Sequence, residues 1–430
     1  MTQRGIAGVL LAIMLLASIA NGLIAAVPAW VPGLVAWTAA ALLWPELSSP
    51  QRRQCLVLVA VGFGGVVIGR VHGVAVDFSR LLDENQAIIS LIAGVSFVHM
   101  ATPAVSPHDL AAPRGPTAFL RTLVGLNLLA AAINITALML VSDRVSRSRP
   151  LGRLEASAFS RAFSLAVLYS PFIGGMALAL NQAPEARLSK VAMIGVILAV
   201  LGIGYTFLVA KNRFSDLLTE FSGYPLRLDV LWLPAALAAA VVALRFAWPN
   251  VPVLTATAML APLIAYIGVA RRAGPGQAGA GLVAHTKLRL PGMSGELALF
   301  LSAGVLAVGL SSAFAASGIV LHETRFPGAG AAVALLVVVL VAAAGLHPII
   351  SLTALIPLLD PLALSPEATV LLYVAGWSIG CALCPFSGTN LVLQARHGIP
   401  AWRFPQWSAG YGLFMWLLAS AALILESTLH

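Results

Sequence analysis

The sequence predicts an all-α polytopic membrane protein, with about eleven transmembrane helices and two re-entrant helical hairpins in two inverted repeats. Three observations lead to this fold class. The 430 residues are 60% hydrophobic and only 10% charged, whereas soluble domains carry about 25% charged residues. Apolar segments of about 20 residues alternate with short loops that hold arginine and lysine. Motifs rich in Pro, Gly and small polar residues interrupt these segments at matching places in both halves.

Each spanning helix is predicted from an apolar run long enough to cross the hydrocarbon core. The first run, which follows Arg4, resembles a signal peptide but continues to Val27, so we expect an uncleaved helix. The predicted helices cover residues 5–27, 30–47, 54–70, 87–103, 158–182, 190–210, 229–247, 251–270, 297–319, 366–393 and 407–426. Two further apolar stretches, 117–145 and 327–362, are interpreted from the charges beside them.

The distribution of positive charge predicts the orientation, because loops rich in Arg and Lys stay in the cytoplasm. The loop 143–161 holds five arginines and is expected inside, whereas the acidic loop 71–86 is expected outside. With a cytoplasmic N-terminus, a single crossing by 117–145 would place the arginine-rich loop outside. A re-entrant hairpin with its tip near Asn134 keeps that loop inside. The same reasoning makes 327–362 a hairpin entered from outside and leaves the C-terminus outside.

These orientations divide the chain into two six-element repeats that insert in opposite senses. The predicted divisions are an extra N-terminal helix (1–29), a first repeat (30–210), a cytoplasmic linker (211–228) and a second repeat (229–430). Each repeat holds a hairpin, 117–145 or 327–362, followed by a broken helix, 158–182 or 366–393. Inverted repeats of this kind place a binding site near the bilayer midplane, at the repeat interface.

Matched motifs mark the hairpins and the breaks. Residues 134–138 (Asn-Ile-Thr-Ala-Leu) correspond to residues 351–355 (Ser-Leu-Thr-Ala-Leu). Residues 170–175 (Ser-Pro-Phe-Ile-Gly-Gly) correspond to residues 384–389 (Cys-Pro-Phe-Ser-Gly-Thr). Helix-breaking residues at membrane depth are tolerated only where neighbours, water or a ligand satisfy the freed backbone groups. The four points are therefore the first places to look for a binding site.

The order of elements and these motifs resemble the ion transporter superfamily, which includes divalent anion/sodium symporters, citrate transporters and arsenite permeases. Residues 134–140 resemble the Ser-Asn-Thr-Ala-Thr hairpin tip of the symporters, although isoleucine precedes and follows the asparagine here. Residues 172–175 resemble the Ile-Gly-Gly run that breaks their next helix, and residues 385–390 resemble its partner in the second half. The resemblance implies a homodimer in which a transport domain slides against a scaffold, with the four loops binding a small anion and sodium.

The candidate binding residues are the polar residues and glycines at these four points, namely Asn134, Thr136, Ser170, Gly174, Gly175, His347, Ser351, Thr353, Ser387, Gly388, Thr389 and Asn390. A small anion in an apolar setting needs N–H groups, hydroxyls and helix N-termini, and glycine lets the backbone approach closely. Each Ser or Thr could instead bond a carbonyl or pack against a helix. His347 could bind an anion or carry a proton, or it could cap the broken helix beside Pro348. If sodium binds, we expect it near Asn134, Gly174, Ser351 and Gly388.

Several classes of function are disfavoured. The predicted spans lack the midmembrane carboxylate that cation/proton antiporters generally need. The chain has no GxxxxGK[ST] nucleotide loop and no HExxH motif. Cys381 and Cys384 have CxxC spacing without a second pair, which is typical of buried packing residues. The net charge of +9 comes from short loops, so it indicates topology and not nucleic-acid binding.

The sequence therefore predicts a non-enzymatic secondary transporter of a small, carboxylate-like organic anion, coupled to sodium or protons, and the resemblance implies an elevator mechanism and a homodimer. We expect the protein in the bilayer of a bacterial cytoplasmic (inner) membrane, with no cofactor beyond a sodium ion. The alternative is a polytopic membrane enzyme or a protein that handles lipids or polyprenyl-linked glycans, which the short, acidic loop 71–86 disfavours. A non-catalytic assembly protein would leave the matched breaks without a purpose.

Overall fold

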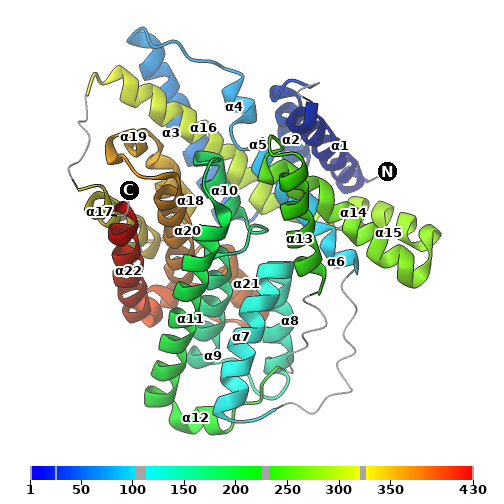
Figure 1. Cartoon of the computed structure of the whole chain (residues 1–430), viewed down its shortest axis with the longest axis vertical. Coiled ribbons are helices and arrows are strands. Elements are labelled where there is room, and N and C mark those ends of the chain that lie inside the picture. Colours follow the sequence, from blue (N-terminus) through cyan, green and yellow to red (C-terminus); the bar gives the residue numbers. More distant parts are fainter. Residues whose placement is uncertain (1, 25–26, 102–112, 225–231, 320–325, 429–430) are drawn as a thin grey trace. The chain divides into compact units, whose positions relative to one another are not determined.

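The computed structural model of the chain describes residues 2–24, 27–101, 113–224, 232–319 and 326–428 (Figure 1). In these ranges the regular elements are helices, joined by turns and one isolated bridge between Arg114 and Ser222. By length and composition, nine helices of the described ranges can cross a membrane, and three shorter helices are also apolar. The prediction of an all-α polytopic membrane protein is confirmed. The ends of some predicted segments, at 25–26, 102–103 and 225–231, lie outside the described residues.

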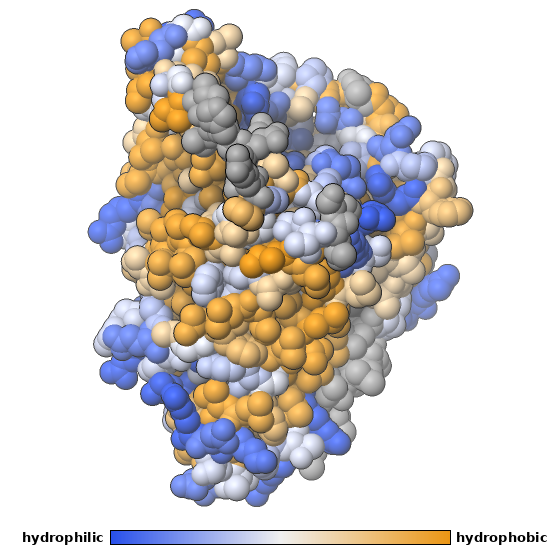
Figure 2. Space-filling model, turned by 60° about the vertical axis from the view of Figure 1, so that its left-hand side comes forward, coloured by the Kyte–Doolittle hydropathy of each residue, from blue (hydrophilic) through white to orange (hydrophobic). Residues whose placement is uncertain are grey.

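Large hydrophobic side chains cover much of the surface, as the orange residues in Figure 2 show. Examples with more than half of the side chain exposed are Leu16, Val57, Val71, Val200 and Leu340. Contiguous apolar surface of this extent is rare on soluble monomers, but in a bilayer it faces lipid tails. The exposed surface therefore agrees with the apolar composition.

The chain forms two compact units, and each takes segments from both halves of the sequence. Unit 1 comprises Met1–Pro103, Leu233–His322 and Thr353–Pro357. Unit 2 comprises the remaining segments, Ala104–Trp232, Glu323–Leu352 and Leu358–His430. Each predicted repeat thus contributes to both units. The inverted relation between the repeats stays a prediction.

Unit 1 is a set of helices that pack through small residues. Its helices are α1 (Gln3–Ile24), α2 (Trp30–Leu43), α3 (Ser49–Val71), α4 (Arg80–Asp83), α5 (Gln86–Ser96), α6 (Val98–Ala101), α13 (Trp232–Ala247, in this unit from Leu233), α14 (Val253–Ala273), α15 (Pro275–Leu288) and α16 (Ser294–Ala316). Helices α3 and α16 approach so closely that a Cβ added at Gly62 would lie 2.5 Å from the Val305 carbonyl oxygen. Close backbone approach through small residues is the usual way in which membrane helices associate.

Helix α15 lies between the predicted helices 251–270 and 297–319, where the sequence analysis predicted no helix. Its glycines give it a low helix propensity, so packing must stabilise it. His285 of α15 is buried, and its Nε2 lies 2.9 Å from Ser96 Oγ in α5. Its ring also contacts Phe97, with a centroid distance of 4.4 Å. Tertiary contacts therefore decide the structure of this segment.

Unit 2 repeats one order of elements twice: a helical pair, an interrupted helix and a long helix. The first set is α7 (Pro116–Ile133) and α8 (Ile135–Ser146), α9 (Arg153–Leu165) and α10 (Gly174–Gln182), then α11 (Leu188–Arg213) and the short α12 (Ser215–Thr219). The second set is α17 (Pro327–Ala343) and α18 (Pro348–Ala354), the short α19 (Leu359–Leu362), α20 (Pro366–Leu383) and α21 (Gly388–His397), then α22 (Phe404–Thr428).

The interrupted helices lie at the centre of unit 2. Residues 154–165 of α9 and residues 367–383 of α20 are all buried. Helices α7 and α8 lie side by side and turn at Asn134, where the sequence predicts a hairpin tip (Figure 1). The turn between α17 and α18 falls at residues 344–347, within the predicted hairpin 327–362. Entry of the first pair from the cytoplasm and of the second pair from outside stays a prediction.

Candidate functional site

The second helix break, residues 384–387, is closed by side chains of its own segment. Asn390 Nδ2 donates hydrogen bonds to the carbonyl oxygens of Cys384, at 2.8 Å, and Cys381, at 3.2 Å. Ser387 Oγ donates to the Cys381 carbonyl at 2.8 Å and accepts from the Asn390 N–H at 3.3 Å. Carbonyls freed at the end of α20 are thereby satisfied without a ligand, and Ser387 is the N-cap of α21.

Asn390 is further held by the first half of the chain. Ser160 Oγ of α9 donates to Asn390 Oδ1 at 2.6 Å. Both ends of the buried amide therefore have protein partners. Asn390 therefore has a structural role, because it bonds protein groups; the sequence left this role open as the alternative to ligand binding.

The start of α21, next to this break, faces open space. Gly388 is exposed, and a Cβ added there would meet no atom within 4 Å. The N–H groups of a first helical turn lack acceptors within the helix, and the helix dipole adds positive potential there. Thr389 is buried in the same turn, and Phe386 just before it is 47% exposed. The arrangement can accept an anion at Gly388.

The first break, residues 169–173, is held instead by the neighbouring hairpin. Ser170 Oγ donates to the Ala131 carbonyl of α7 at 2.7 Å. Tyr169 donates from its hydroxyl to Asn127 Oδ1, also on α7, at 2.7 Å. Helix α10 then begins at Gly174, with no side-chain hydrogen bond capping it. The first hairpin and the first break therefore form one structure.

The first hairpin tip has an unusual backbone. Asn134 has φ of 50° and ψ of −137°, a region that glycine favours and other residues adopt at a cost. Its side chain is half-buried, as is that of Thr136 in the first turn of α8. Conformations of this kind persist where the surrounding structure imposes them, and they are concentrated at functional sites.

The second hairpin tip uses glycine at the equivalent turn, since Gly345 has φ of 109°. His347 is buried, and its Nδ1 accepts a hydrogen bond from the Ile349 N–H at 3.2 Å. This contact is the capping role that the sequence left open, and the proton-carrying role stays a prediction. Ser351 Oγ donates to the Pro348 carbonyl at 3.2 Å, so this hydroxyl also has a backbone partner.

Trp377 of α20 joins the second tip to the first break. Its ring lies edge-on to the His347 ring, with a centroid distance of 5.4 Å. On another side it covers Gly175, where an added Cβ would lie 2.5 Å from Trp377 Cγ. The second tip also contacts the second break, because Gly345 lies close to the Phe386 ring and Cys384 Sγ lies 3.5 Å from the carbonyl oxygen of residue 346. Sequence reasoning missed Trp377; the signal was a tryptophan between Gly376 and Ser378 in a long apolar segment.

Unit 2 thus holds every candidate residue except Thr353, which belongs to the segment Thr353–Pro357 of unit 1. The Thr353 hydroxyl is buried and has no hydrogen-bond partner in the described part of the chain. In unit 2 the first hairpin contacts the first break, and the second tip contacts the second break directly and the first break through Trp377. The described residues include no group of three or more His, Cys, Asp or Glu side chains that could hold a metal ion.

Comparison of the sequence with protein families and with curated proteins finds no match. Among solved structures, the chain is similar to the crystal structure of the YdaH transporter from Alcanivorax borkumensis. The two chains are 13% identical; the match covers 86% of this chain and 85% of that chain, with a TM-score of 0.47.

Proposed function

We propose that the protein is a secondary transporter of a small organic anion, with the hairpin tips and helix breaks of unit 2 forming its substrate site. The start of α21 carries this proposal. Asn390 and Ser387 satisfy the carbonyl end of the break, while the N–H end of α21 faces open space at Gly388. Free N–H groups beside satisfied carbonyls favour an anion.

The division of the chain into compact units supports alternating access by an elevator mechanism. Unit 2 holds nearly all candidate residues in one connected body. Such a body can carry a bound anion without rearranging the site itself. Coupling to sodium or protons, a homodimer, and an inner membrane with the N-terminus inside and the C-terminus outside are parts of the same proposal.

The substrate class can be identified by a thermal-shift screen of the purified protein against small carboxylates, sulfonates and other oxyanions, each with sodium and with potassium. A ligand that binds only the folded state raises the apparent melting temperature. We expect a shift with one anion class, larger in sodium if sodium is the coupling ion. A folded protein that responds to no anion would contradict the proposal and favour a lipid-handling role.

The location of the site is tested by Gly388→Trp, because the open space there accommodates a ring that would block the start of α21. Uptake of the identified anion into proteoliposomes should fall by about tenfold or more, which corresponds to the loss of about 1.4 kcal/mol of binding. Gly204→Trp in α11 is the matched control, because an added Cβ at Gly204 also meets no atom within 4 Å. Equal uptake by the two variants would show that the site lies elsewhere.

A further inference from the structure

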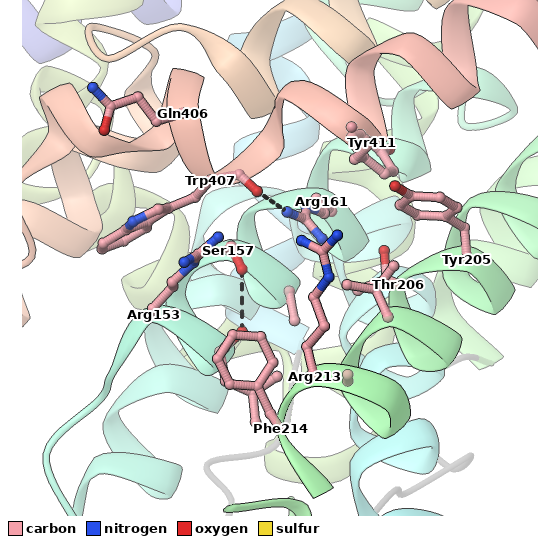
Figure 3. A pocket seen from close by; sticks show the side chains of 15 residues that line it. Arg153, Ser157, Arg161, Tyr205, Thr206, Arg213, Phe214, Gln406, Trp407 and Tyr411 are labelled. Carbon is pink, nitrogen blue, oxygen red and sulfur yellow. Dashed lines mark hydrogen bonds between the residues drawn. The ribbon is translucent and has the colours of Figure 1, made fainter.

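A separate pocket of about 110 Å³ opens in unit 2 between α9, α11 and α22 (Figure 3). None of the residues at the hairpin tips or helix breaks lines it. Three arginines do line it, Arg153, Arg161 and Arg213, and the lining includes no Asp or Glu. The pocket therefore concentrates positive charge that its own walls do not balance.

Arg161 is the buried member of the three, with 5% of its surface exposed. Its Nη2 donates to the Trp407 carbonyl at 2.6 Å and its Nε donates to Ser408 Oγ at 3.2 Å. These bonds use two of its five N–H donors. No carboxylate of the described residues forms an ion pair with it, and burying a charge without a partner is costly. A bound anion would offset that cost.

Arg153 and Arg213 are exposed and belong to α9 and to the end of α11. In Figure 3 the Arg213 side chain points from α11 toward Arg161. Arg153 lies over the Phe214 ring, 5.8 Å from its centroid, which restrains its position beside the pocket. Two solvent-accessible arginines thus lead to a buried one.

Tyr411 provides an independent observation. It lines the same pocket, is only 1% exposed, and stacks under the Arg161 guanidinium, 5.2 Å from the ring centroid. Its hydroxyl is buried and has no hydrogen-bond partner in the described part of the chain. Buried hydroxyls are almost always partnered, so an unpaired one on a residue that lines a pocket indicates a missing acceptor.

We propose that this pocket binds a phosphate group, held by the three arginines and the Tyr411 hydroxyl. Guanidinium groups match the geometry of phosphate oxygens and form strong charge-assisted hydrogen bonds with them. The volume of about 110 Å³ is sufficient for one such group. The phosphate comes either from solution or from the headgroup of an anionic lipid, and both present the same oxygens. This assignment does not depend on the proposed transport function.

The test is phosphate binding by the purified full-length protein. One arm titrates inorganic phosphate in detergent against chloride at equal ionic strength. The other compares nanodiscs that contain phosphatidic acid with nanodiscs of phosphatidylcholine alone, and both arms measure the melting temperature. A shift in the first arm identifies free phosphate as a ligand, and a shift confined to the second identifies a lipid headgroup.

Two variants then locate the binding. Tyr411→Phe removes only the unpaired hydroxyl and should weaken binding about tenfold without lowering the stability of the ligand-free protein. The double variant Arg153→Gln/Arg213→Gln changes exposed side chains and should weaken binding more. Arg147→Gln/Arg271→Gln removes two exposed arginines outside the pocket and serves as the matched control. No shift in either arm, or equal shifts in all variants, would overturn the assignment.

Discussion

The two helix breaks of unit 2 resemble each other in sequence but are held together in different ways. At the second break, Asn390 and Ser387 bond carbonyls a few residues earlier in the same segment. At the first, Ser170 and Tyr169 bond groups on α7, about forty residues away along the chain. One break is closed locally, and the other is closed only when the hairpin packs against it.

This difference decides which break can bind a ligand. Local closure leaves the start of α21 uncovered, and Gly388 faces open space. At the first break Trp377 covers Gly175, so the start of α10 is closed. Matching motifs therefore do not imply matching accessibility, and the second break is the better candidate for substrate contact.

The largest effect is expected from Asn390→Leu. The variant removes the amide's hydrogen bonds to two buried carbonyls, which keep their bonds from Ser387, and it leaves the Ser160 hydroxyl without its acceptor. We expect the free energy of unfolding to fall by about 3 kcal/mol, because a buried unsatisfied group costs about 1–3 kcal/mol and each lost hydrogen bond about 1 kcal/mol. Ser170→Ala removes one hydroxyl at the first break and should cost about 1 kcal/mol. Unfolding in mixed micelles measures both, and a larger loss for Ser170→Ala would reverse the comparison.

An intermediate effect is expected from Gly175→Ala. The new methyl group would lie 2.5 Å from Trp377 Cγ, within the buried centre of the unit. Overpacking of this kind costs about 1–3 kcal/mol, because the ring must shift. Gly388→Ala, in open space at a helix start, should change stability by less than about 1 kcal/mol. Equal melting temperatures for the two variants would show that the breaks are equally accessible.

The smallest effect concerns the hairpin tips. Asn134→Gly keeps the turn and should raise stability by up to about 1 kcal/mol, because it relieves a positive φ. If the Asn134 amide binds the anion, uptake should fall even though stability rises. Gly345→Ala makes the opposite change at φ of 109° and should lower stability. Unchanged uptake in a stabilised Asn134→Gly variant would remove this residue from the proposed site.

Much of the local structure was predictable because it depends on short stretches of the chain. Apolar runs of sufficient length indicate the spanning helices, and Pro, Gly and small polar residues indicate where helices stop. The turn at Asn134 and the break at residues 384–387 follow from such local rules. Ligand contact at these points does not follow, because Ser, Asn and His bond the backbone equally well, as Ser170, Asn390 and His347 do.

The sequence by itself determined that the chain lies in a membrane, where most of the long helices are and where two of them are broken. Only the tertiary structure decided how those segments assemble, since both compact units combine both halves. It also decided the environment of Arg161, which the charge pattern counted among the arginines of the cytoplasmic loop 143–161. Arg161 lies in α9, as the predicted helix 158–182 allows, but it is buried against Trp407 and Ser408. The reason is physical: hydropathy and helix breaking act over a few residues, whereas burial and electrostatic environment depend on residues that are distant in the chain.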